Sequence, residues 1–148
     1  MLRNTCGLIV ADDRKIQLGE LSHPRALSAM PFGGRYRIID FHLSNMVNSG
    51  IRQIGITTYN KYKSLMDHIG TGSAWDLDTK RQGLFFLTPF INSESYGTGP
   101  DDISGILNLY RELTQDYILI TGPNVIMNAS FDDMRDYHED KKADITVM

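Results

Sequence analysis

The stretch from residue 31 to residue 58, PFGGRYRIIDFHLSNMVNSGIRQIGITT, decides the fold. It begins with a turn, because Pro31 fixes its own φ and the Gly33-Gly34 pair adopts positive φ without steric cost. Four apolar residues then recur at the helical spacing i, i+4, i+7 and i+8: Ile39, Leu43, Met46 and Val47. Gly50 is a natural residue to end this helix. The β-branched run Ile51 to Thr58 predicts a strand directly after it.

The same alternation of strand and helix extends along the whole chain. Further strands are predicted at 5–11, 84–87, 117–121 and 143–148, and further helices at 60–70, 101–113 and 130–140. Alternation of this kind predicts right-handed βαβ crossovers, hence an α/β fold with a mostly parallel sheet and helices on both faces. The chain stops on its last predicted strand, so we expect residues 1–148 to be the N-terminal part of a longer domain.

Composition excludes several classes of protein. The net charge is −3, and the 41% hydrophobic and 22% charged fractions are typical of a soluble globular domain. The basic residues are scattered, which argues against a nucleic-acid or anionic membrane surface. Cys6 is the only cysteine, so no internal disulfide forms, and this fits a reducing compartment. No apolar run approaches the ~18 residues of a membrane span, and no signal peptide is evident, so we expect a cytoplasmic protein.

The turn before the first long helix carries an unusual density of polar groups, including Arg35, Arg37 and Asp40. One interpretation is structural: the turn caps the helix and ties an arginine to a carboxylate, as clustered charges often do. The other is a ligand site, in which Arg35 and Arg37 beside Gly33 hold a phosphate. Spacing alone leaves both open. In parallel sheets ligands bind beyond the carboxyl ends of the strands, here the loops at 11–20, 57–60, 88–100 and 121–124.

The motif P-F-G-G-R-Y-R-I-I-D-F-x-L-S-N at 31–45, continuing as N-S-G-I at 48–51, resembles glucose-1-phosphate adenylyltransferase (ADP-glucose pyrophosphorylase). The similarity extends through L-G-E-L at 18–21, R-A at 25–26 and S-L-x-x-H-I at 64–69. It implies a Rossmann-like nucleotidyltransferase domain, followed in the family by a left-handed β-helix. It also implies chemistry that joins ATP and glucose 1-phosphate into ADP-glucose and pyrophosphate with Mg²⁺, for glycogen or starch synthesis.

Catalytic members of that family carry a loop resembling A-G-G-x-G-x-R-L after the first strand, in which backbone N–H groups approach a triphosphate. This chain has ADDRKIQL at 11–18 in its place. Asp12, Asp13 and Lys15 stand at the glycine positions, and Gln17 stands at the arginine position. Two carboxylates facing a triphosphate repel it, so the resemblance implies that this loop has lost its phosphate-binding role.

The chain departs from the pattern of catalytic family members at two further positions. Where the family has R-A-K-P-A, this chain has RALSA at 25–29, so Leu27 replaces a phosphate-binding lysine. Where catalytic members have G-D-H with an aspartate that holds Mg²⁺, this chain has GPN at 122–124, so Pro123 offers no side-chain oxygen. The segment YGTGPDD at 96–102 keeps an aspartate of the family motif, most simply Asp101, as a candidate ligand-binding residue.

Together these losses favour a homologue with little or no activity alone, resembling the regulatory-type subunit that pairs with a catalytic subunit in some bacteria. No catalytic residue, metal site or cofactor is then expected on this chain, because Mg²⁺ and ATP belong to the catalytic partner in a hetero-oligomer. Two alternatives remain: an active adenylyltransferase in which Arg14 and Lys15 hold the phosphates, and a module that binds a nucleotide or sugar-phosphate effector. The four histidines show no metal-binding spacing and are expected to be structural or exposed.

Overall fold

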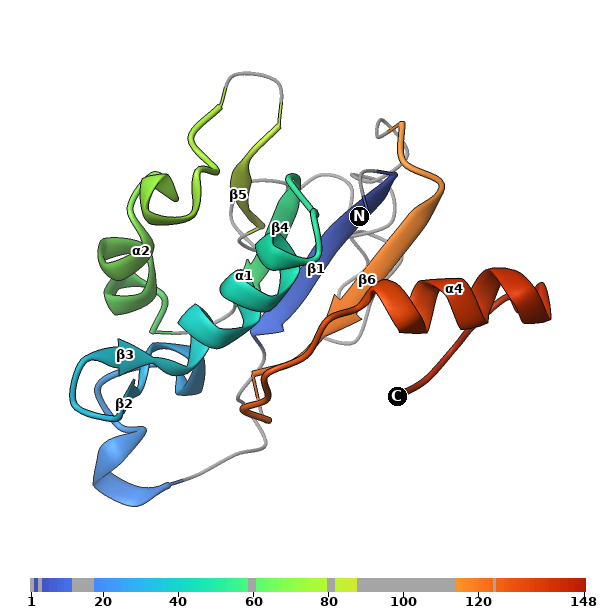
Figure 1. Ribbon diagram of the computed structural model, residues 1–148. Helices are drawn as coiled ribbons and strands as arrows, with labels where there is room; N and C mark the ends of the chain where they lie inside the picture. Colours follow the sequence, from blue (N-terminus) through green and yellow to red (C-terminus); the bar gives the residue numbers. More distant parts are fainter. Residues whose placement is uncertain are drawn as a thin grey trace, which may run out of the picture.

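The described residues form an α/β fold on a four-stranded parallel sheet (Figure 1). The computed structural model describes residues 2, 4–11, 18–58, 61–79, 82–87, 114–123 and 125–148. The strands are β1 (Thr5–Ala11), β4 (Ile54–Thr58), β5 (Leu84–Leu87) and β6 (Tyr117–Thr121), in the spatial order β5-β4-β1-β6. The predicted α/β class and mostly parallel sheet are therefore confirmed.

Strand β1 lies at the centre of the sheet, as its continuous apolar run predicts. It pairs with β4 on one side and β6 on the other, so that Ala11 lies opposite Thr58. Its two faces are both buried: Ile9 is 0% exposed on one, and Cys6 and Leu8 are each 1% exposed on the other. The described helices cover the first face, and the helix expected at 101–113 lies outside the described residues.

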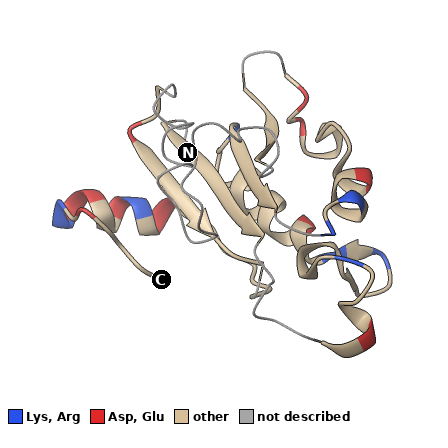
Figure 2. Cartoon of the chain, turned by 180° about the vertical axis from the view of Figure 1, so that it is seen from behind, with Lys and Arg blue, Asp and Glu red and all other residues tan. Residues whose placement is uncertain are grey.

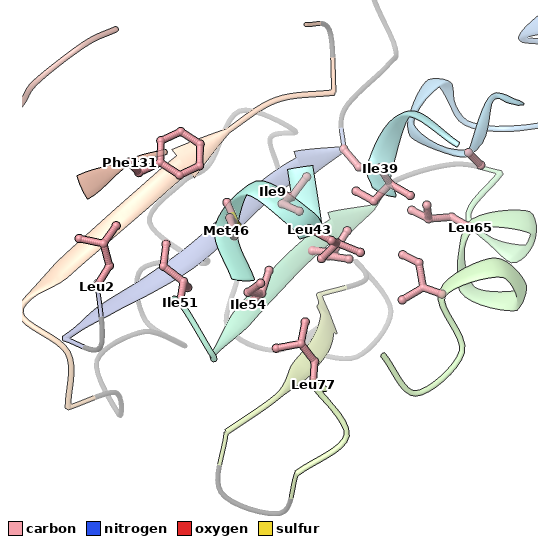
Figure 3. Close-up of a cluster of buried hydrophobic side chains, with 14 residues drawn as sticks. Leu2, Ile9, Ile39, Leu43, Met46, Ile51, Ile54, Leu65, Leu77 and Phe131 are labelled. Carbon is pink, nitrogen blue, oxygen red and sulfur yellow. The ribbon is translucent and has the colours of Figure 1, made fainter. Parts of the chain in front are cut away.

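Helix α1 (Ile38–Asn48) packs on the first face of the sheet, and α2 (Lys63–Ile69) packs beside it (Figure 1). The core between these helices and the sheet consists of fully buried side chains (Figure 3): Ile39, Leu43 and Met46 of α1, Leu65 of α2, and Ile9, Ile54 and Ile56 of the sheet. Burying one such side chain stabilises a fold by about 1.5–3 kcal/mol. The apolar spacing of the sequence thus identifies the face of α1 that forms the core.

The end of α1 is built as its sequence predicts. Gly50 has φ +91°, and its N–H bonds to Val47 O over 2.9 Å while Ile51 N–H bonds to Met46 O over 3.0 Å. This pair of bonds is a Schellman motif, which needs a residue with positive φ and ends the helix. Ile51 is fully buried beside Met46, so the chain turns directly into the core and on to β4.

The predicted turn before α1 is a small antiparallel hairpin of β2 (Pro31–Phe32) and β3 (Tyr36–Arg37). Gly33 and Gly34 lie at its tip with φ +61° and +75°. Phe41 of α1 anchors the hairpin, because the rings of Phe32 and Tyr36 meet it edge-on with centroids 5.6 and 5.9 Å away. This turn is therefore held by aromatic contacts.

Three short 3-10 helices lie in the connections: η1 (Gly19–Leu21), η2 (Leu27–Ala29) and η3 (Ser73–Trp75). The indole N–H of Trp75 donates to Ser44 Oγ over 3.1 Å and joins the irregular segment at 71–83 to α1. No helix in the described ranges is long and apolar enough to cross a membrane.

The prediction of a strand at 143–148 is wrong for this structure. A strand needs a neighbour for its N–H and C=O groups, and this segment pairs with none of the described residues. Ile145 and Val147 are instead 81% and 87% exposed. Helix boundaries shift slightly: the helix expected from residue 60 begins at Lys63, and α4 (Asp132–Lys141) begins two residues after Ser130.

Candidate functional site

The carboxyl edge of the sheet is the first place where the sequence predicts ligand chemistry. Thr58 ends β4 and Thr121 ends β6 on either side of β1. Gly122 and the buried Pro123 follow Thr121. These residues place no carboxylate at the described strand ends. Magnesium in phosphoryl chemistry needs carboxylate ligands, so this part of the edge does not fit the ion.

Leu27 lies in η2, which packs against both α1 and α2. It is only 6% exposed, and its neighbour Ala29 is fully buried. An apolar side chain in this setting contributes to packing and offers no charge to a phosphate. The other altered positions of the resemblance, Asp12, Asp13, Lys15 and Gln17, and the candidate Asp101, lie outside the described residues, so these remain predictions.

The polar cluster before α1 forms a hydrogen-bonded junction with α2. Arg37 Nη1 donates to the carbonyl oxygen of Ser64 over 2.7 Å and to its Oγ over 2.8 Å. Asp40 accepts the backbone N–H of Arg37 over 2.9 Å, and its other oxygen lies 2.6 Å from His68 Nε2. The bond from Asp40 to the Arg37 N–H satisfies one of the free donors at the start of the helix. The stretch thus caps the helix as the structural interpretation predicts. The expected pairing of an arginine side chain with a carboxylate is not what the described residues show, because the Arg37 guanidinium binds Ser64 and the Asp40 carboxylate pairs with His68.

An open pocket of about 530 Å³ adjoins this junction. It is lined by Pro24, Arg37, Lys63, Ser64, Asp67 and His68. Three of these side chains carry basic nitrogen, and Figure 2 shows Lys and Arg gathered at the hairpin and the start of α2. Gly33 and Arg35 lie exposed at the tip of the hairpin and do not line the pocket. The predicted Gly33, Arg35 and Arg37 therefore do not converge on one described cavity.

A second polar group, which the sequence did not reveal, lies along α1 and its C-terminal cap residue. His42, Asn45 and Ser49 follow the spacing i, i+3, i+7 and are 2%, 5% and 0% exposed. Asn45 Nδ2 donates to Met127 O over 2.9 Å, and Ser49 Oγ accepts the N–H of Phe131 over 3.0 Å. We call these three residues the polar stripe. It holds the irregular segment that follows β6.

His42 is the titratable member of the polar stripe. Its Nδ1 lies 3.3 Å from Thr121 Oγ1 at the end of β6. Burial lowers the pKa of His42 below its usual value, and the nearby backbone of Val125 opposes this shift only in part. The ring is therefore neutral near pH 7. A single His in a helix does not show whether its side chain is buried. The only indication of burial in the sequence is that positions 42, 45 and 49 lie next to the apolar stripe of α1.

No group of three His, Cys, Asp or Glu side chains within the described residues is arranged to hold a metal ion. His138 instead lies 2.8 Å from Thr146 Oγ1 through its Nδ1, and His68 pairs with Asp40. The acidic residues of α4 lie on a helix that buries none of its own residues (Figure 2). A solvated helix face is the simplest account of them.

Comparison with known proteins decides the family. A family model described as nucleotidyl transferase matches residues 14–148. The chain belongs to the nucleotidyl transferase family. The match begins beyond β1 and includes the α1–α2 junction, the polar stripe and the segment after β6.

Curated proteins resemble this chain over almost its whole length. It is 39% identical over 142 residues to "Glycogen biosynthesis protein GlgD" of Bacillus subtilis, covering 95% of this chain and 41% of that protein. It is 37% identical over 150 residues to "Glucose-1-phosphate adenylyltransferase" of the same species, covering 99% of this chain and 40% of that protein. A protein of the latter name from Thermosipho africanus is 36% identical, with 99% and 36% covered. The chain thus spans about two fifths of the length of these relatives.

Proposed function

We propose that this chain belongs to a regulatory, catalytically impaired subunit of glucose-1-phosphate adenylyltransferase in glycogen biosynthesis. The resemblance to both GlgD and the adenylyltransferase supports the pathway. The observation that carries the proposal is the pair Leu27 and Pro123, which are both buried and both lack charge. They stand where the resemblance places a phosphate-binding lysine and a metal-binding aspartate.

The physical argument concerns transition-state charge. Phosphoryl transfer develops negative charge that catalytic enzymes neutralise with cations and metal ions, and each such group contributes roughly 2–4 kcal/mol. The described residues supply neither charge at these two positions. The fold meanwhile keeps its core, its α1–α2 junction and its hairpin intact. A preserved scaffold with missing charges suits a subunit that acts through a partner.

The test uses the full-length protein and a catalytic glucose-1-phosphate adenylyltransferase subunit from the same organism. ADP-glucose synthesis is measured for each protein alone and for the two together, and co-purification is measured in parallel. We expect negligible synthesis by the full-length protein alone, a stable complex, and a higher rate with the catalytic subunit than that subunit shows by itself. Substantial synthesis by the protein alone would overturn the proposal.

A second candidate function is effector sensing, and the pocket beside the α1–α2 junction favours it. Arg37, Lys63 and His68 line this pocket together with one carboxylate, Asp67, so basic side chains outnumber acidic ones and suit an anionic group such as a phosphate. The Arg37 guanidinium reaches Ser64 through Nη1 alone, which leaves donors of its other nitrogens to face a ligand. A regulatory subunit and an effector sensor are compatible roles.

Calorimetry with ATP, AMP and sugar phosphates tests the sensing role in the full-length protein. We expect binding that weakens at least tenfold in Lys63→Ala, while the exposed Lys142→Ala at the end of α4 leaves it unchanged. Absence of binding by all these compounds would remove this candidate and leave the regulatory role untouched.

A further inference from the structure

The segment after β6 depends on side chains of α1 for its path. Residues 125–130 contain no helix or strand. The side chain of Asn45 donates to Met127 O and accepts the N–H of Ala129 over 3.4 Å. Ser49 Oγ accepts the N–H of Phe131. Contacts of this kind bind an irregular segment only while the helix face that makes them stays packed against it.

His42 lies at the end of the polar stripe next to β6, and the nitrogens of its ring make few hydrogen bonds. The side chain is 2% exposed, and its Nδ1 lies 3.3 Å from Thr121 Oγ1. Its Nε2 is buried and meets no hydrogen-bond partner among the described residues. A buried neutral imidazole tolerates this arrangement, but a buried imidazolium has two donors and a charge to satisfy.

The backbone of Val125 favours a positive charge on His42 but offsets only part of the effect of burial. Residues 125–131 carry no charged side chain, and the only titratable groups in β1 and β6 are Cys6 and Tyr117, near the opposite ends of those strands. On α1 itself, the carboxylate of Asp40 is engaged by His68. Asp12 and Asp13 follow β1 in the sequence and lie outside the described residues, so a double variant of these two aspartates serves as a control.

We propose that His42 is a pH-dependent latch: its neutral ring keeps residues 121–123 and 125–131 packed on α1, and protonation of the ring releases them. In the packed state, burial holds the pKa of His42 below its ordinary value of 6.5. In the released state, the ring meets water and regains that ordinary value. As the pH falls below about 6.5, the released state takes up a proton first, so the packed state loses stability. The latch is closed at neutral pH and weakens on acidification.

Hydrogen exchange of the full-length protein measures this opening directly. The reporters are the amides of Ala129 and Phe131, which donate to Asn45 and Ser49. Their protection factors, corrected for the intrinsic rate at each pH, are compared from about pH 7.5 to about pH 5. We expect these factors to fall severalfold, and at most tenfold, for each pH unit below about 6.5. The amide of Ile9 in the central strand serves as an internal reference and keeps its protection.

Matched variants identify the titrating group. His42→Asn places an amide near the position of Nδ1 without a titratable ring, and we expect the pH dependence to vanish. His23→Asn changes an exposed histidine and leaves the dependence unchanged, as does the double variant Asp12→Asn with Asp13→Asn. Persistence of the dependence in His42→Asn, or its loss in the double aspartate variant, would overturn the proposal.

An NMR titration of the His42 ring in the unaltered protein makes the test independent of whether His42→Asn folds. We expect the ring to titrate below 6.5 in the packed state, together with loss of protection at Ala129 and Phe131. A pKa of the His42 ring at or above 6.5 would contradict the latch. So would protection of the two amides that stays constant while the ring titrates.

Discussion

His68 Nε2 lies 2.6 Å from Asp40 Oδ1, and this contact joins the first turn of α1 to the last turn of α2. The other oxygen of Asp40 accepts the N–H of Arg37, whose guanidinium reaches Ser64 of α2. The two helices are therefore joined twice within one short junction. This junction also forms a wall of the pocket that we propose to bind an effector.

Replacing Asp40 with Ala is expected to destabilise the protein by about 1–3 kcal/mol, because the N–H of Arg37 and the ring of His68 both lose their partner. Asp67→Ala, an exposed carboxylate on α2, is the matched control and is expected to change stability by less than about 0.5 kcal/mol. Denaturant unfolding of the three proteins measures both values. Equal effects of the two substitutions would show that the junction contributes little.

Replacing Asn45 with Ala is expected to cost about 1–3 kcal/mol, since Met127 O and the N–H of Ala129 both lose their side-chain partner. The neighbouring Asn48 is exposed on the same helix, so Asn48→Ala provides a matched control with an expected change below about 0.5 kcal/mol. Hydrogen exchange should locate the Asn45→Ala effect at residues 127–131. Uniform loss of protection throughout the sheet would contradict the assigned role of the polar stripe.

Replacing Gly50 with Ala forces a Cβ onto a residue with φ +91° and is expected to destabilise the end of α1 by about 1 kcal/mol or more. Gly50→Asn should cost less, because Asn is the next most frequent residue at this position. The difference between the two variants in thermal unfolding tests the backbone explanation. If Asn proved as costly as Ala, crowding around the side chain would explain the loss better than φ.

Cys6 is expected to resist alkylation in the folded protein at about pH 8. Cys6 is 1% exposed, and burial raises the pKa of its thiol to about 11, so the reactive thiolate is scarce. Denaturant should restore the ordinary reactivity of an unfolded cysteine. Mass spectrometry after treatment with iodoacetamide measures both states, and rapid labelling without denaturant would contradict the buried position on the second face.

Much of the fold was predictable because it depends on periodic burial. The apolar spacing of Ile39, Leu43 and Met46 and the run at 5–11 are sufficient to identify α1 and the central strand. Gly50 was equally informative, since few residues besides glycine satisfy a Schellman motif. The segment at 143–148 was misjudged because an apolar pattern predicts the capacity to form a strand, whereas a strand also needs a neighbour.

The candidate site was only partly predictable. The charges at Arg37 and Asp40 indicated a junction, but sequence alone does not show that Ser64 and His68 of α2 receive them. The polar stripe was missed because a single His, Asn or Ser in a helix is usually solvated, and only tertiary packing turns these three inward. In the stretch at 31–45, Arg37 and Asp40 form a structural junction with α2, and Arg37 also lines the neighbouring pocket.

Steady-state ADP-glucose synthesis by the full-length protein, alone and mixed with the catalytic subunit, tests the central claim most directly. The buried, uncharged Leu27 and Pro123 predict negligible product from the protein alone and a raised rate for the mixture over the catalytic subunit by itself. Efficient synthesis by the protein alone, or a mixture no faster than the catalytic subunit, would contradict a regulatory role.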